Sequence, residues 1–578
     1  MRRLPPHARK RCKYRTKAGV VGGVMTSSAN AAPTDSPRFP RLAPRAWLAV
    51  ALPMVLYAMA AVSTWGPAYL DFGDGNYLYI ARRMADGLVL YRDILSPQPP
   101  LHTLLASQML HLGDALTPAA PYLPVRLYSL LLRLGTAVLM MWLVWRLMAP
   151  PLASPAERQL AAVLAVWLHL SIPLGFWWTL GFQTHPLLMA VFLTAFLLLT
   201  FEGRAATVAA GAMLGLTLLT SMTALPYLAF IMLWHLLRRP ARLLLLIPPM
   251  VATYAAVAWW FHVQSQGAFL TNVVFNQVGS FPREELTGEP LWQYAVRKIT
   301  REGTKILGLE AAYLVVGFAG IGAWSARAWK AHATGAPRGW DLFPLLALAF
   351  AGSLVFVSKG ATVDYIFTLG EPLLCVFGAV ALAVAVVPLM RGAPRLASGC
   401  PRPVGAAARR WALVALALLV LGQATRNAFF YAEVLGGSQW EMQADDVRQV
   451  IGVIEQHTRP GDAMLTPPFY AFISGRRVAG EYAEIFLWNI KYWNERLLPE
   501  FQGVPPGEGI QKVQELAALL RRGEIPLVIL DLNQTGQIPE IREALEAAYE
   551  PWGEPFRSMN TPMRFHVPRR AAMDGASF

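Results

Sequence analysis

The feature that most constrains this chain is a series of apolar runs long enough to cross a lipid bilayer. A helix that spans ~30 Å of hydrocarbon needs about 20 apolar residues in a row. Inside the hydrocarbon every backbone polar group must be bonded within the protein, so runs of this length fold as helices. Of the 578 residues, 55% are hydrophobic and 15% are charged, and the mean hydropathy is +0.38. The sequence therefore predicts a polytopic α-helical membrane protein.

Hydropathy and charged breaks predict about eleven transmembrane helices. With the N-terminus in the cytoplasm, the connections on the cytoplasmic side are basic; the loop 391–410, for example, holds five Arg and no acid. Around Pro226 the two short spans leave open a re-entrant turn or a kinked helix. The predicted spans are 47–66, 124–148, 159–178, 184–201, 205–221, 224–238, 243–261, 306–326, 342–358, 364–390 and 411–431.

The formal net charge of +15 does not indicate a nucleic-acid-binding protein. The first 17 residues carry eight Lys or Arg and no acid. Such short basic segments beside apolar runs are typical of cytoplasmic loops that contact membrane lipids. A small and polar linker follows the basic start, so no cleavable signal peptide is expected; either Met1 or Met25 could be the start. The three cysteines, Cys12, Cys375 and Cys400, lie outside the predicted outer segments and indicate no disulfide framework.

An odd number of spans places the C-terminus on the outer side of the membrane. Beyond the last span the composition turns mildly acidic, in contrast with the basic cytoplasmic loops. "DVRQVIGVIEQH" has helical periodicity and "PLVILDL" has the length of a strand. We therefore expect a basic cytoplasmic tail at 1–45, a transmembrane domain at 46–435 and a soluble extracytoplasmic α/β domain at 436–578.

The densest group of polar residues follows the first span, in the outer loop 67–123. The stretch "NYLYIARRMADG" predicts an amphipathic helix at the membrane interface, with Tyr77, Ile80 and Met84 on its apolar side. Asp74 stands just before this helix, where a carboxylate can cap it. The following "SPQPPLHTLL" predicts a rigid turn that directs the chain back towards the membrane.

This loop resembles the first periplasmic loop of the C-type (GT-C) glycosyltransferases. The shared pattern is acid–x–x–Tyr–x–x–Ile–Ala–Arg, then Gly, Tyr-Arg-Asp and Pro-Pro-Leu. The segments "GFQTHPLLMAVFLTAFLLL" and "DYIFTLGEPLL" also resemble recurring family segments. The superfamily includes protein O-mannosyltransferases and the aminoarabinose transferase of lipid A. The resemblance implies a GT-C-like fold in the bacterial inner membrane, a polyprenyl-phosphate sugar as donor, and an acidic residue of this loop as catalytic base.

The loop also departs from the family pattern. Members often carry two adjacent acids, and alignment places Asp74 at the second acid and Gly73 at the first. Asp71 could supply the missing carboxylate. Gln98 stands where Lys or Asn is usual before Pro-Pro, and His185 stands where a second acid is common before Pro. Asp74 is therefore the first choice for the base and Asp71 the second.

The implied reaction moves a sugar from a lipid phosphate to a hydroxyl with inversion at the anomeric carbon. A positioned carboxylate that accepts the hydroxyl proton typically accelerates such a step ~10²–10⁴-fold. We expect this carboxylate to face the exterior beside a cavity open to lipid. The leaving phosphate needs positive charge, which arginine supplies in bidentate form; for Arg126 and Arg133, snorkelling to the headgroups is the alternative. The candidates for phosphate binding are Arg82, Arg83, Arg92, Arg126, Arg133 and Lys359.

Glu371 is predicted a turn or two inside the membrane, where an unpaired carboxylate is unfavourable, so it could pair with an Arg or receive a substrate hydroxyl. No histidines show ligand spacing with an acid, and no cofactor is expected, although Asp71 with Asp74 could hold a divalent cation. Further candidate site residues are Tyr77, Gln98, His102, His185, Asp364 and Glu371.

Two other function classes compete with the transferase. A transporter or flippase for a lipid-linked glycan would tend to show repeated halves and broken helices, and the sequence has no clear internal repeat. A sensor that binds cell-wall material through its outer domain would leave the pattern of the first outer loop unexplained. The sequence does not specify the sugar, nor whether the acceptor is a glycan, a lipid or a protein.

Overall fold

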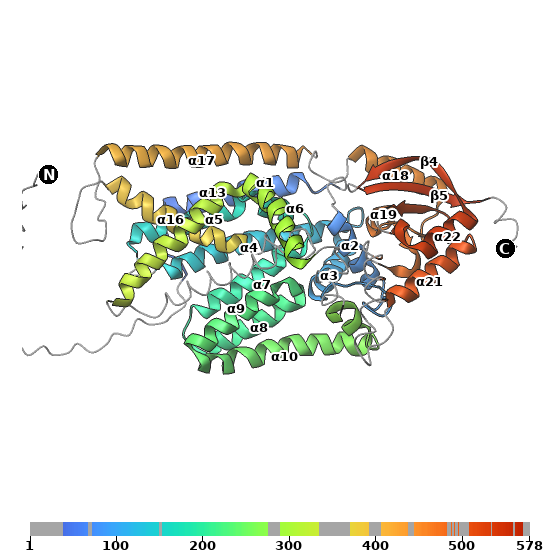
Figure 1. Ribbon diagram of the computed structural model, residues 1–578, viewed down its shortest axis with the longest axis horizontal. Helices are drawn as coiled ribbons and strands as arrows, with labels where there is room; N and C mark the ends of the chain where they lie inside the picture. Colours follow the sequence, from blue (N-terminus) through green and yellow to red (C-terminus); the bar gives the residue numbers. More distant parts are fainter. Residues whose placement is uncertain are drawn as a thin grey trace, which may run out of the picture. The chain divides into compact units, whose positions relative to one another are not determined.

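The computed structural model groups residues Phe39–Phe578 into one unit of membrane-type helices and a C-terminal region of mixed helices and strands (Figure 1). The structure describes residues 39–66, 72–148, 153–275, 290–333, 370–391, 406–436, 444–482, 508–532, 535–558 and 561–569, together with 487, 491 and 495.

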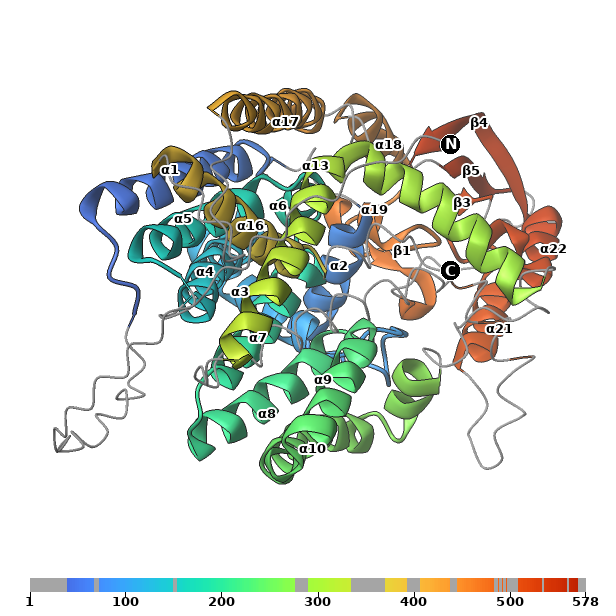
Figure 2. The same ribbon diagram turned by 60° about the vertical axis from the view of Figure 1, so that its left-hand side comes forward.

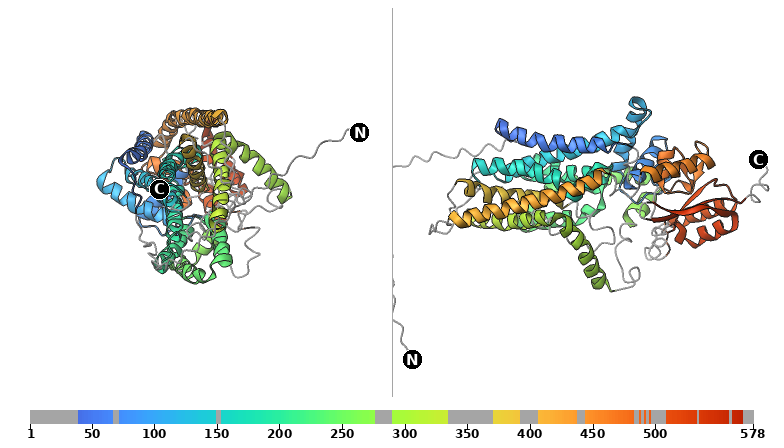
Figure 3. Two further views of the ribbon diagram at one scale, coloured as in Figure 1. Left: turned by 90° about the vertical axis from the view of Figure 1, so that its left-hand side faces the viewer. Right: turned by 90° about the horizontal axis from the view of Figure 1, so that it is seen from above.

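Each predicted span contains a helix, except 342–358, which lies outside the described residues. The predicted total of eleven is therefore not tested. Within the described ranges, four helices are by themselves long and apolar enough to cross a membrane: α1 (Pro44–Ser63), α4 (Leu123–Leu147), α10 (Pro240–Gln264) and the part Ile306–Ser325 of α13 (Leu291–Ala333). The other helices in this part are α7 (Thr184–Leu199), α8 (Arg204–Thr220), α9 (Leu225–Arg238), α16 (Glu371–Arg391) and α17 (Ala406–Leu435). Figure 3 shows these helices side by side in two further views.

The predicted span 159–178 is broken rather than continuous. It consists of α5 (Pro155–Ser171) and α6 (Pro173–Leu180), which are bent by 61°. Pro173 has no N–H, and its ring disfavours the helical conformation of the residue before it. Ile172 is accordingly extended, with φ −73° and ψ 125°. Near Pro226, a 3₁₀ turn, η2 (Met222–Ala224), connects α8 to α9.

The described part of the loop 67–123, which was expected on the outer side, contains two helices, α2 (Phe72–Ala85) and α3 (Leu101–Leu116). A helix was expected here, but its position differs from the expectation in two ways. Every residue from Asp74 to Ala81 is buried, so α2 is not an interfacial amphipathic helix. Asp74 lies within the first helical turn rather than before the helix, because α2 already includes Phe72. Tertiary packing, which the spacing of apolar residues does not report, decides both points.

The C-terminal region combines a short parallel strand pair with a three-stranded antiparallel sheet of order β3-β5-β4. An isolated bridge between Leu465 and Val528 connects the two sets of strands. Ala463 pairs with Arg477 in the parallel pair, and Val528 pairs with His566 in the antiparallel sheet. The elements are α18 (Ala444–His457), β1 (Ala463–Met464), α19 (Pro468–Ser474), β2 (Arg477–Val478), α21 (Glu508–Arg521), β3 (Val528–Asp531), α22 (Pro539–Ala548), β4 (Tyr549–Ser558) and β5 (Thr561–Pro568).

The C-terminal region contacts helix α2 directly, and Figure 2 shows α19 beside α2. Tyr79 Oη donates to Glu481 at 2.8 Å and accepts from the Val478 N–H at 2.7 Å. Arg83 donates to both oxygens of Glu481, at 2.9 and 2.7 Å. The two segments lie some 400 residues apart in sequence. The helix that carries Asp74 is thus held between α3 and the C-terminal region.

Candidate active site

Asp74 and Arg126 form a buried ion pair where helices α2, α4 and α6 meet. Arg126 Nη2 lies 2.9 Å from Asp74 Oδ2, and the side chains are 1% and 0% exposed. Arg126 Nη1 also donates to the Leu180 carbonyl, the last of α6, at 3.1 Å. Taking two charges out of water is unfavourable unless they neutralise each other and are hydrogen-bonded. The guanidinium therefore favours the ionised form of Asp74, the form that a general base needs.

Two glycines allow the backbone to approach this pair closely. A Cβ atom at Gly181 would lie 2.8 Å from both carboxylate oxygens of Asp74. A Cβ atom at Gly73 would lie 2.4 Å from Nε2 of Gln183. The resemblance described above implies another acid at the position of Gly73, and in this chain the amide of Gln183 occupies the neighbouring space. The segments "FGDG" and "GFQ" therefore pack directly against each other.

The Asp74 side chain does not face the exterior as expected. The carboxylate is fully buried, at 0% exposure, and is covered by Gly181 and Arg126. An acceptor hydroxyl must come within about 3 Å of a base to transfer its proton. Substrates can therefore reach Asp74 only when the groups that cover it move.

Two other predicted site residues, Tyr77 and His102, lie next to the 181–183 segment. The Tyr77 ring meets His102 edge-on at 5.0 Å, and His102 stacks on Phe182 at 4.0 Å. Burial, together with the nearby His185, lowers the pKa of His102 to about 3. His102 is therefore neutral at physiological pH and acts here as an aromatic side chain. Gln98 contributes its backbone carbonyl, which accepts from Tyr91 Oη at 2.6 Å.

A second buried ionisable cluster lies two turns further along α4. Arg133 is 0% exposed and donates to Met189 Sδ at 3.3 Å and to the carbonyl of His169. A Cβ atom at Gly175 would lie 2.2 Å from Glu371 Oε2 and 3.1 Å from Arg133 Nη2. Arg133 and Glu371 thus come together, as one reading of Glu371 expected. The snorkelling alternative is wrong for both Arg126 and Arg133, since neither side chain reaches the surface.

The fold of this chain is similar to that of solved structures. No protein-family model matches the chain, and no curated protein matches it. The crystal structure of ArnT from Cupriavidus metallidurans bound to undecaprenyl phosphate superposes with a TM-score of 0.57 at 14% identity, covering 90% of this chain and 98% of that one. The chain therefore shares the fold of this ArnT structure.

Two further solved structures superpose less closely. The apo structure of ArnT from the same organism gives a TM-score of 0.46 at 16% identity, covering 88% of this chain and 97% of that one. Arabinofuranosyltransferase AftD from mycobacteria gives 0.44 at 15% identity, covering 92% of this chain and 42% of that one. The fold assignment rests on the first superposition.

Three of the arginines predicted to bind phosphate instead bind carboxylates close to them. Arg82 pairs with Asp114 at 2.7 Å, and Arg92 pairs with Asp93 at 2.9 Å. Arg83 pairs with Asp86 at 2.6 Å in addition to the Glu481 contact described above. Along α2, Arg82 and Arg83 lie about 12 Å from Asp74 at 1.5 Å per residue. The structure does not bring these three arginines to the Asp74–Arg126 pair. Asp71, Lys359 and Asp364 lie outside the described residues.

Some residues of the site were missed by sequence reasoning. Gln183, Gly181 and the Leu180 carbonyl had no individual signal, although "GFQTH" was noted as a family-like segment. Glu310 does have a signal in the sequence: it is an acid inside the predicted span 306–326, where charges mark functional or structural contacts.

Within the described ranges, no group of three or more His, Cys, Asp or Glu could hold a metal ion.

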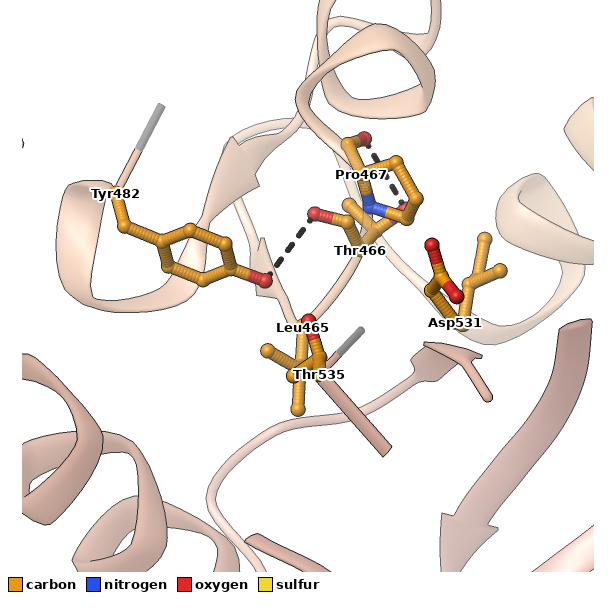
Figure 4. A pocket seen from close by; sticks show the side chains of 7 residues that line it. Leu465, Thr466, Pro467, Tyr482, Asp531 and Thr535 are labelled. Atoms are coloured by element: carbon orange, nitrogen blue, oxygen red, sulfur yellow. Dashed lines mark hydrogen bonds between the residues drawn. The ribbon is translucent and has the colours of Figure 1, made fainter. Parts of the chain in front are cut away.

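A separate small pocket lies in the C-terminal region (Figure 4). Tyr482 and Asp531 line it from opposite sides, and Tyr482 Oη lies 3.5 Å from the Thr466 carbonyl. Burial raises the pKa of Tyr482, so its hydroxyl stays protonated. None of the site residues predicted from the sequence lines this pocket. The lining residues are Leu465, Thr466, Pro467, Tyr482, Ile529, Asp531 and Thr535.

Replacing Gly181 with alanine tests the contact with Asp74. The added methyl would lie 2.8 Å from both carboxylate oxygens, so either Asp74 or the 181–183 segment must shift. A displacement of about 1 Å of a catalytic group can reduce turnover about 10²-fold, and we expect a loss of this size in a transfer assay. Gly135→Ala in α4 is the control, because a Cβ atom there has nothing within 4 Å. Equal activity of both variants would contradict the contact.

Acid sensitivity tests the buried state of His102. Its pKa in the folded protein, about 3, is below the ordinary value of 6.5 for histidine, so between these values the unfolded chain binds the extra proton. Stability therefore rises with pH in this window and falls as pH is lowered from 6.5 towards 3, by up to about 1.4 kcal/mol per pH unit. His102→Gln should flatten the dependence of the melting temperature on pH. His111→Gln, at an exposed position of the same helix, should keep the wild-type slope.

Proposed function

We propose that this protein is a membrane glycosyltransferase that moves a sugar from a polyprenyl-phosphate donor to a cell-envelope acceptor at the outer face of the bacterial inner membrane. The observation that carries the proposal is the buried Asp74–Arg126 pair, located in the first outer loop and at the start of α4 of a GT-C fold. The similarity to an ArnT structure bound to undecaprenyl phosphate supports a lipid-phosphate donor.

In the proposed reaction the acceptor hydroxyl attacks the anomeric carbon of the donor while Asp74 accepts the hydroxyl proton. The new bond joins the acceptor oxygen to the anomeric carbon, and the bond from that carbon to the phosphate oxygen breaks. The polyprenyl phosphate leaves with both electrons of that bond, and Arg126 neutralises its charge. A single displacement of this kind inverts the anomeric configuration.

Arg126 can serve both the base and the phosphate because its guanidinium carries several donors in a fixed plane. In the described conformation this group binds Asp74 and the end of α6. A phosphate that enters beside Arg126 competes with Asp74 for the guanidinium, and the carboxylate is then released for the acceptor. Donor binding would thus uncover the base, which is fully buried in the described conformation.

The proposed topology follows from the first outer loop. Residues 1–45 form the cytoplasmic tail, 46–435 the catalytic membrane domain and 436–578 the extracytoplasmic domain. The contacts of Glu481 with Tyr79 and Arg83 support the last assignment, because they require α2 and the C-terminal region to lie on the same side of the membrane. Asp71, Lys359 and Asp364 stay predictions as further site residues, and we propose no metal or other cofactor.

One observation favours the alternative of a transporter or flippase for a lipid-linked glycan. The break between α5 and α6 is a feature that transporters use at substrate sites. Mass spectrometry of envelope glycans from a deletion strain separates the two functions. A glycan that lacks one sugar supports the transferase, and the missing sugar identifies the donor. Accumulation of a complete lipid-linked glycan that has not crossed the membrane supports the transporter and overturns the transferase.

A further inference from the structure

The break between α5 and α6 leaves backbone polar groups without their helical partners. The carbonyls of His169 and Ser171 lie in the last turn of α5, and the N–H of Leu174 lies in the first turn of α6. Inside a bilayer no water is available to these groups, so they must be bonded within the protein. The break is therefore tolerated only if side chains of neighbouring helices reach it.

Side chains from three other helices do reach the break. Glu310 of α13 accepts from the Leu174 N–H at 3.0 Å and so caps the start of α6. Arg133 of α4 donates to the His169 carbonyl. The Ser171 carbonyl accepts from Tyr313 at 2.7 Å, from Asn427 at 2.8 Å and from Tyr431. Glu310 itself has non-helical torsion angles, φ −125° and ψ 19°, so α13 is distorted where it supplies this cap.

Glu310 and Glu371 form a carboxyl pair next to Arg133. Both side chains are 0% exposed, and both reach the first turn of α6, Glu310 at Leu174 and Glu371 at Gly175. Two ionised carboxylates so close together would repel each other in a low-dielectric interior, which favours one proton held between them. The pair then carries a single negative charge, which balances the positive charge of Arg133. A neutral cluster is what a low-dielectric interior favours.

The opposite end of α6 leads into the candidate active site. Leu180, the last residue of α6, accepts from Arg126 at 3.1 Å, and Gly181 contacts the Asp74 carboxylate. The helix has only 8 residues between its cap at Glu310 and this contact. A shift at its capped start therefore moves the segment that holds the Asp74–Arg126 pair.

We propose that Glu310 and Glu371 are positioning residues that share one proton and, together with Arg133, fix α6 so that its end holds Asp74 and Arg126 in place. This inference rests on the proposed function only for the role of Asp74 as base. The position of α6 can be measured without any transfer activity, so the two proposals can fail separately.

The test uses Glu310→Gln, Glu371→Gln, the double variant and Glu310→Leu in the full-length protein reconstituted in lipid nanodiscs. Hydrogen–deuterium exchange over residues 173–183 reports the state of α6, and the transfer assay gives kcat and KM. Each single Gln variant keeps an oxygen that can accept from the Leu174 N–H and has an amide that can donate to the remaining carboxylate. That carboxylate still balances the charge of Arg133. We expect exchange as in the wild type and a kcat within about threefold of it.

The double variant leaves Arg133 without a negative charge, and Glu310→Leu removes the cap of α6. In both, exchange over 173–183 should rise and kcat should fall about 10²-fold, while KM for the donor stays nearly constant. Glu157→Gln is the matched control, because Glu157 is a mostly buried carboxylate that pairs with Arg327 at 2.8 Å at the far end of α5. It should leave exchange over 173–183 unchanged.

Two results would overturn the inference. One is a double variant whose kcat falls by no more than the product of the factors for the two single variants. A shared proton requires a larger fall in kcat. The other is unchanged exchange over 173–183 in a variant whose transfer is lost, which would indicate direct contact with substrate. If the double variant does not accumulate, the comparison of Glu310→Gln with Glu310→Leu tests the inference. Raised hydrogen–deuterium exchange over 173–183 in the Leu variant alone supports it, and equal exchange in the two variants overturns it. Absence of transfer by the wild type would refute the proposed function and leave the exchange comparison intact.

Discussion

Asp74→Asn is expected to abolish sugar transfer in membranes supplied with a polyprenyl-phosphate sugar. Asparagine keeps the shape of the side chain and an oxygen that can accept from Arg126, but it cannot accept the proton of the acceptor hydroxyl. Loss of general-base catalysis typically reduces the rate ~10²–10⁴-fold. Initial rates per amount of protein, measured by incorporation of labelled sugar, would show this loss.

The structure adds a control for this variant. Asp114 is also a carboxylate of the first outer loop that pairs with an arginine, at 2.7 Å, but its side chain is 44% exposed. Exposed pairs contribute about 0–1 kcal/mol, so Asp114→Asn should transfer sugar at the wild-type rate. Wild-type turnover by Asp74→Asn would exclude Asp74 as the base and direct attention to Asp71.

Arg126→Gln is expected to weaken the donor complex and the base together. A hydrogen bond to a charged group contributes about 1.5–3 kcal/mol, so loss of the guanidinium should raise the donor KM about 10–100-fold. The change also leaves Asp74 buried without its positive partner, which costs about 3–5 kcal/mol of stability and favours the protonated carboxyl. We therefore expect both a higher KM and a lower kcat, together with a lower melting temperature.

The double variant Asp74→Asn/Arg126→Gln separates stability from catalysis. It removes both buried charges, so its melting temperature should lie above the value expected from adding the two single effects. Transfer should stay absent, because neither the base nor the phosphate ligand is restored. The exposed pair Arg82→Gln/Asp114→Asn serves as the matched cycle and should show little coupling. Additive effects on stability at Asp74 and Arg126 would contradict the buried ion pair.

The complete burial of Asp74 changes what the mechanism requires. A base that faces an open cavity needs only a bound substrate, whereas Asp74 is covered by Gly181 and Arg126. Exchange of Arg126 between the carboxylate and a phosphate offers a route for uncovering it. The contacts that hold α2 and α6 therefore bear on access to the base as well as on its position.

The sequence by itself determined that the chain is a helical membrane protein and where the helices of the described spans lie. It also placed Asp74, the candidate base, in the loop after the first span. These features depend on runs of apolar residues and on local motifs, which act over a few neighbouring residues. The sequence also proposed Arg126, Arg133 and Glu371 as site residues, because a charged side chain at or inside a membrane span is unfavourable unless it has a partner or a function.

Only the tertiary structure decided which charges meet. Arg82, Arg83 and Arg126 look alike in the sequence, yet the first two bind carboxylates nearby and the third binds Asp74. The broken helix α5–α6 and its cap by Glu310 join residues 136 positions apart. Such pairings depend on the close approach of distant backbone segments, which glycines at 73, 175 and 181 permit. Periodicity and spacing carry no information about contacts over this range, so the packing alone reveals them.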